Sequence, residues 1–254
     1  MKNYILPLLV TATLICVCAP HAVLQKSGQS DDANKYCDMG EAYFHKGDYD
    51  RAIEEFTKAI RLNPNDASAY IYRAFMYYHK SDYDRIIADC NEAIRLNPNS
   101  CEDPYIGRGL AYSKKGDHDK AIADYNKAIQ INPNSAMAYN NRCYTYAKKG
   151  EYDIAIADCD EAIRLNPNMT EGYDTRGYTY VKKGDYDKAI ADCNEAIRRN
   201  PNIDTAYRSR GIAYLGKKEY DKAIADLETA LRLDPNDKET KENLEAAKRG
   251  SQID

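Results

Sequence analysis

The chain of 254 residues contains no tryptophan and only three phenylalanines, yet it has 23 tyrosines. It also lacks an excess of basic charge, because 36 Lys and Arg side chains stand against 40 Asp and Glu, for a formal net charge of −4. Nucleic-acid binding depends on a concentrated basic face. The composition therefore argues against a nucleic-acid partner, and the uneven aromatic usage indicates a repeated motif.

The motifs of the common catalytic and cofactor sites are missing as well. The sequence has no nucleophile elbow, no phosphate-binding loop and no glycine-rich dinucleotide motif. It also has no Cys-x-x-Cys and no close cluster of cysteine and histidine. We therefore predict that the protein is not an enzyme and that it uses no cofactor and no metal ion.

The N-terminal segment has the three parts of a secretory signal. Lys2 precedes an apolar run over residues 5–18, and small residues follow around Ala19 and Ala22. The run is shorter than the roughly 20 residues that a membrane-spanning helix needs. We predict a signal peptide over 1–22 and a flexible leader over 23–32. A short uncleaved membrane anchor, or a lipid on Cys16 or Cys18, stays open; the expected localisation is exported, either periplasmic or secreted.

A fixed period organises the rest of the chain. Asn-Pro-Asn or Asp-Pro-Asn recurs every 34 or 35 residues, at Pro64, Pro98, Pro133, Pro167, Pro201 and Pro235. Each period also holds two aromatic residues seven positions apart, such as Tyr36 and Tyr43, which share one face of a helix. A turn such as 46–50 and a second apolar stretch follow, so we predict two helices in each period.

Small residues recur where the two helices of a period face each other, at Gly40, Ala74, Gly109, Cys143, Gly177 and Gly211. With the tyrosines and prolines, this pattern resembles the tetratricopeptide repeat, six times over about residues 33–236. The resemblance implies an all-α fold, a right-handed α-solenoid of six helix-turn-helix repeats. Residues 237–249 are predicted to form a capping helix, which covers the apolar face of the last repeat, and 250–254 a tail.

In the resembled family, the first helices line a concave face that holds a peptide or helix of a partner. The resemblance therefore implies a non-catalytic scaffold for protein–protein interaction. Its expected groove is apolar toward the N-terminal half and polar toward the C-terminal half, and consists of Ile71, Phe75, Tyr78, Ile106, Leu110, Asn140, Tyr144, Asp174, Tyr178, Arg208 and Ile212. The alternative is a structural array that self-associates into homo-oligomers. The partner's identity is not indicated, and membrane contact is expected only through the N-terminal segment.

Two side-chain patterns lead to structural predictions. An arginine appears once in each repeat from the second onward, and an acid appears on every second helix, from Glu55 to Asp226. The first repeat has Met39 instead of arginine, so we predict that each arginine pairs with the acid of the preceding repeat. Cys90, Cys159 and Cys193 share one position of the second helix and are predicted to be buried small hydrophobes, since neighbouring copies lie too far apart for a disulfide.

Overall fold

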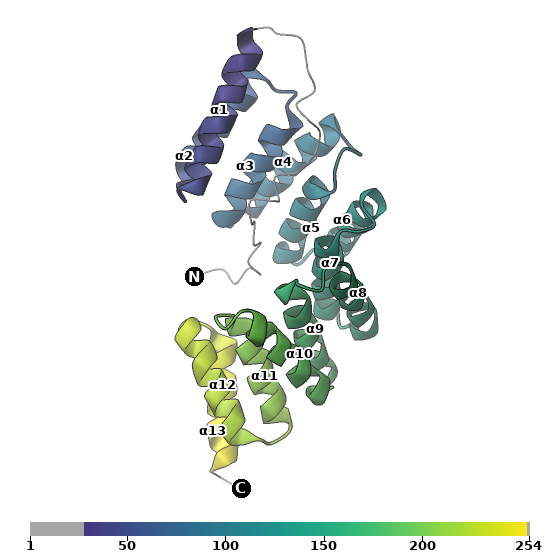
Figure 1. The fold of residues 1–254 in the computed structure, drawn as a ribbon, viewed down its shortest axis with the longest axis vertical. Coiled ribbons are helices and arrows are strands. Elements are labelled where there is room, and N and C mark those ends of the chain that lie inside the picture. The colour runs from purple at the N-terminus through teal and green to yellow at the C-terminus, as the bar shows by residue number, and fades with distance from the viewer. Residues whose placement is uncertain (1–27, 253–254) are drawn as a thin grey trace. The chain divides into compact units, whose positions relative to one another are not determined.

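The computed structural model describes residues 28–252, and all regular structure in that range is helical (Figure 1). The helices are α1 (Gly28–His45), α2 (Tyr49–Leu62), α3 (Ala67–His79), α4 (Tyr83–Leu96), α5 (Asp103–Lys115), α6 (His118–Ile131), α7 (Ala136–Lys149), α8 (Tyr152–Leu165), α9 (Thr170–Lys183), α10 (Tyr186–Arg199), α11 (Asp204–Gly216), α12 (Tyr220–Leu233) and α13 (Lys238–Ser251). The predicted all-α repeat fold class is confirmed. Within the described range, no helix combines the length and the apolar character needed to cross a bilayer.

The chain divides into two compact units. One ends at Asn134 and holds α1–α6, and the other begins at Ser135 and holds α7–α13. In each unit the odd-numbered helix of a repeat packs against the even-numbered helix that follows it, and against the even-numbered helix before it. First helices of successive repeats also contact each other, as α3 does α5 and α9 does α11. Each unit is therefore a stack of helix pairs.

The ends of the helices follow from the residues at the turns. The first helices α5, α7 and α9 end at Gly116, Gly150 and Gly184, whose φ angles of +87°, +83° and +90° lie in the left-handed region that favours glycine. Before α2, the Asp48 side chain accepts a hydrogen bond from the backbone N–H of Arg51 at 3.2 Å. These turns reverse the chain between the two helices of each repeat.

Close approach of the two helices depends on the small residue of each repeat. A Cβ atom added to Gly40 would lie 2.8 Å from the Phe56 ring, and one added to Gly211 would lie 2.7 Å from Leu227. Both distances are below van der Waals contact, so a larger side chain at either position would force the helices apart. The cores of these two repeats thus form between one small and one larger buried residue.

The last helix covers the apolar end of the C-terminal unit. Ala247 of α13 is fully buried and packs with Ala223 and Leu227 of α12, while Leu244 packs against the same cluster. α13 occupies the part of the chain where the sequence predicts a capping helix. In the N-terminal unit, α1 begins at Gly28, so residues 28–32 are helical although the sequence places them in a flexible leader. A helix extends by a residue at small cost once packing of its later turns has nucleated it. The predicted signal peptide and residues 23–27 lie outside the described residues.

Candidate partner-binding face

The repeated arginines are bound within their own repeats. Arg73 of α3 donates from Nε and Nη2 to both oxygens of Asp89 in α4, at 2.9 and 2.7 Å. The same two bonds join Arg108 to Asp124, Arg142 to Asp158, Arg176 to Asp192 and Arg210 to Asp226. The prediction of pairing with the preceding repeat is therefore wrong. Residues 16 positions apart face each other across a helix pair. Each arginine therefore lies closer to this acid of its own repeat than to the equivalent acid of the previous repeat.

A third bond of the same guanidinium, from Nη1, does reach the previous repeat. Nη1 of Arg73 donates to Thr57 at 3.0 Å, and Nη1 of Arg176 donates to Asp160 at 2.5 Å. The guanidinium carbon of Arg176 also lies 5.8 Å from the centre of the Tyr173 ring. The contacts of these arginines hold the repeats together, so their side chains are not available to a partner. The candidate binding face is therefore formed by the other accessible side chains of the first helices.

In the N-terminal unit, this face is aromatic. Phe75 is half-buried, and its ring centre lies 5.5 Å from that of Phe44 and 5.0 Å from that of His79. His79 also stacks on Tyr49 at 4.2 Å, and burial lowers the pKa of its imidazole. Of the other predicted groove residues in this unit, Ile71 and Leu110 are half-buried, whereas Tyr78 and Ile106 are 5% and 6% exposed. The last two belong to the core and offer a partner little surface.

In the C-terminal unit, two tyrosines of successive first helices lie together. Tyr144 of α7 and Tyr178 of α9 are half-buried, with ring centres 5.9 Å apart and planes inclined by 35°. Ile212 holds the equivalent position on α11 and is also half-buried. These three side chains are the accessible aromatic and aliphatic members of the predicted groove in this unit.

The polar residues predicted for this half of the groove are mostly buried. Asp174 is 5% exposed and accepts a hydrogen bond from the Thr205 hydroxyl at 2.6 Å. Burial raises the pKa of Asp174 to about 6, although Thr205 and the Arg208 cation act to lower it. Arg208 is bound to Asp237 at 2.6 Å. Asn140 is 1% exposed, and neither polar atom of its side chain has a hydrogen-bond partner among the described residues.

Sequence reasoning missed two lysines beside the tyrosines. Lys148 follows Tyr144 by one helical turn, and its Nζ lies 5.4 Å from the centre of the Tyr144 ring and 5.3 Å from that of Tyr178. Lys182 follows Tyr178 in the same way at 5.4 Å, and its Nζ lies 3.3 Å from a carboxylate oxygen of Glu239 in α13. The spacing of four residues between tyrosine and lysine is the signal that could have identified them.

Family sequence models match most of the repeat region. One tetratricopeptide-repeat model matches residues 103–135 and again residues 136–169, and another matches residues 175–238. A third model, described as TPR repeat, matches residues 40–81. The chain belongs to the tetratricopeptide-repeat (TPR) family. The TPR fold is that of a scaffold for protein–protein interactions.

Solved structures show the same TPR fold. A chain of the APC/C hetero-tetramer Cut9–Hcn1 is 21% identical with a TM-score of 0.78; the match covers 85% of this chain and 43% of that one. YrrB, described as a TPR protein with an unusual peptide-binding site, is 23% identical with a TM-score of 0.55, over 78% of this chain and 98% of its own. PilW, described as a type IV pilus biogenesis factor, is 16% identical with a TM-score of 0.73, over 84% and 98%. No curated protein sequence matches the chain.

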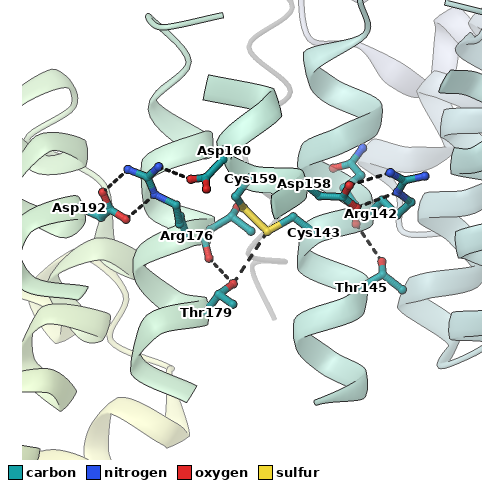
Figure 2. The surroundings of a disulfide bond; sticks show 11 residues. Arg142, Cys143, Thr145, Asp158, Cys159, Asp160, Arg176, Thr179 and Asp192 are labelled. Carbon is teal, nitrogen blue, oxygen red and sulfur yellow. Dashed lines mark hydrogen bonds and ion pairs between the residues drawn. A yellow bond between two sulfur atoms is a disulfide. The ribbon is translucent and has the colours of Figure 1, made fainter. Parts of the chain in front are cut away.

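The fourth TPR repeat contains a disulfide that sequence reasoning did not find. Cys143 of α7 and Cys159 of α8 are bonded, with Cα atoms 5.5 Å apart, and both side chains are fully buried (Figure 2). Cys159 is thus buried as predicted but is half of a disulfide. The argument against disulfides considered copies of one position in neighbouring repeats, whereas the bonded cysteines hold the two facing positions of a single repeat. Their separation of 16 residues, shared with the arginine–aspartate pairs, was the available signal.

Proposed function

We propose that this TPR protein is an exported, non-catalytic scaffold that holds a peptide or helix of a partner protein against its first helices. One observation supports this most strongly. The equivalent positions of five successive repeats hold large side chains that pack on one side and stay accessible on the other, namely Phe75, Leu110, Tyr144, Tyr178 and Ile212. Within each unit, half-buried aromatic and aliphatic side chains on successive first helices are the usual kind of anchor surface for a partner helix or peptide.

The disulfide supports the proposal of export. Disulfides persist in oxidising compartments such as the periplasm and the cell exterior, and they are rare where glutathione keeps thiols reduced. Cys90 and Cys193 remain as thiols, and burial raises the pKa of each thiol well above the ordinary value of a cysteine. Thiols of this kind react slowly because the thiolate is the reactive form. Cell fractionation with thiol alkylation tests the proposal: a cytoplasmic protein with Cys143 and Cys159 reduced would contradict export.

The binding proposal is tested with a matched pair of triple variants. The face variant carries Phe75→Ala, Tyr144→Ala and Tyr178→Ala. The control variant removes three exposed apolar side chains from the second helices, Leu62, Ile154 and Leu233, which are 38%, 50% and 37% exposed. Both variants should retain the helical circular dichroism spectrum of the wild type.

Affinity capture from the native exported fraction then compares the three proteins. We expect partners of the wild type to persist with the control variant and to disappear with the face variant. Partners retained by the face variant, or lost with both variants, would place binding elsewhere. A mass that rises with concentration in light scattering, without a captured partner, would favour the self-associating array.

A further inference from the structure

Lys148 stands at the junction of two repeats on the proposed binding face. Tyr144 lies one turn before it on α7, and Tyr178 lies on α9, the first helix of the next repeat. The ammonium is 5.4 and 5.3 Å from the two ring centres, and the rings are 5.9 Å from each other. A lysine held over two aromatic faces has lost part of its side-chain freedom before any ligand arrives.

The charge of Lys148 is not compensated by a carboxylate. Lys149 lies 3.0 Å from Glu151, Lys182 lies 3.3 Å from Glu239, and Lys183 lies 2.7 Å from Asp153. Among residues 28–252, no carboxylate lies within 4.0 Å of Lys148. The side chain is also exposed, so an external group can reach it.

The ammonium stays charged at neutral pH. Burial acts to lower the pKa of Lys148, but the phenol oxygens of Tyr144 and Tyr178 outweigh it, and the pKa lies above its ordinary value. The site therefore presents a positive charge flanked by two phenol groups, and the next first helix of the same unit holds the half-buried Ile212 at the position equivalent to Tyr178. A carboxylate on an otherwise apolar peptide complements both features.

We propose that Lys148, with Tyr144 and Tyr178 beside it, receives one acidic side chain of the bound partner peptide. This inference rests on the proposed function, because it requires the peptide to lie on the first helices. The neighbouring Lys182 is already paired with Glu239, which repels a second acid. The cluster therefore suits a single aspartate or glutamate within an apolar segment rather than an acidic run.

The test uses random 12-residue peptides displayed on phage and selected on the immobilised full-length chain. Peptides that lose binding to the face variant are kept and aligned. We expect them to share one acidic position with apolar neighbours. Replacing that acid with its amide should weaken binding to the wild type about tenfold, the effect of losing one charged hydrogen bond of modest strength.

A double-mutant cycle assigns the contact to Lys148. Lys148→Met should bind the original peptide about tenfold more weakly than the wild type, and it should bind the amide peptide no worse than the original. Lys149→Met is the matched control, since that lysine is paired with Glu151, and it should keep the wild-type response to both peptides. The circular dichroism spectrum should be unchanged in both variants.

Four results would overturn the inference. If the acid-to-amide change weakened binding equally for the wild type and Lys148→Met, the acid would be recognised elsewhere. If the selected peptides needed the face but carried no acid, this inference would fail while the proposed function survived; if no peptide depended on the face, both would fail. If 10 mM inorganic phosphate displaced acid-free peptides from the wild type but not from Lys148→Met, Lys148 would bind a free anion rather than an acidic side chain of the peptide.

Discussion

Loss of the disulfide should destabilise the protein by an amount that the structure allows us to work out. The perturbation is Cys143→Ala, which leaves Cys159 facing an alanine. The second repeat already contains this arrangement, with Ala74 and Cys90 in the same two positions, 4% and 2% exposed. The variant therefore replaces one packing found in this protein by another, and it isolates the effect of the covalent link.

The expected magnitude follows from the loop that the disulfide closes. The two cysteines are 16 residues apart, and the chain-entropy model gives about 3 kcal/mol of stabilisation for a loop of that length. In a protein of this size, such a loss lowers the Tm by roughly 6–12 °C. The reverse substitution, Ala74→Cys, should form a second disulfide with Cys90 and raise the Tm.

Thermal unfolding followed by circular dichroism, with and without dithiothreitol, is the assay. Mass spectrometry after alkylation establishes which thiols are bonded. Dithiothreitol should lower the Tm of the wild type to that of Cys143→Ala and should leave the variant unchanged. If the wild type is shown to be oxidised and the variant still melts at the same temperature, the reasoning is refuted.

Three further predictions follow from buried charge and from one exposed apolar residue. Arg176→Ala leaves the Asp192 carboxylate, which is 10% exposed, without its bidentate partner. The variant should lower the free energy of unfolding, measured in urea, by about 3–5 kcal/mol, whereas replacing an exposed arginine with alanine should lower it by less than about 1 kcal/mol. Because the pKa of Asp174 is raised to about 6, the folded state binds that proton more tightly than the unfolded chain, so wild-type stability should fall as the pH rises from 4 to 6. Burial raises the pKa of Asp103 to about 6 as well, so Asp174→Asn should show a smaller fall than the wild type rather than none, and parallel Tm curves would contradict the assignment. Ile154 is 50% exposed, and at the equivalent position other repeats hold a lysine or arginine over the ring of a tyrosine. Ile154→Lys should therefore raise the free energy of unfolding by about 0.5–1 kcal/mol, and a lower Tm of the variant would contradict this prediction.

The fold could be predicted because its determinants recur. Six copies of the same tyrosines, small residues and prolines made the period evident, and each copy supports the others. The pairing of side chains could not be predicted for the same reason. An arginine and an acid that each occur once in a repeat fit the pattern equally well whether they pair within a repeat or between neighbours. Only the distance across one helix pair distinguishes Arg176–Asp192 from the alternative.

The candidate face was predicted only in part, because an angular position on a helix does not determine exposure in a stack. Within a unit, first helices contact the first helices of neighbouring repeats as well as their own partners, as α3 does α5 and α9 does α11. Residues toward these neighbours, such as Ile106 and Asp174, are therefore buried, while Tyr144 and Tyr178 remain accessible. Lys148 escaped notice because its significance comes from the tyrosine of the following repeat, which lies 30 residues further along the chain.

The Nη1 bonds that join the arginines to the previous repeat affect how cooperatively the repeats unfold. In a linear array, unfolding spreads from one repeat to the next only as far as the coupling between neighbours allows. The arginine contributes a neutral hydrogen bond to that coupling where it meets Thr57 or Asn194, but an ion pair where Arg176 meets Asp160. Salt screens a charged contact of this kind, since Asp160 is 56% exposed. Ionic strength should therefore weaken the arginine contact between the fourth and fifth repeats more than the neutral contacts of Arg73 and Arg210. Exposed ion pairs such as Lys80–Asp50 and Lys217–Asp187 link other neighbouring repeats and are screened as well.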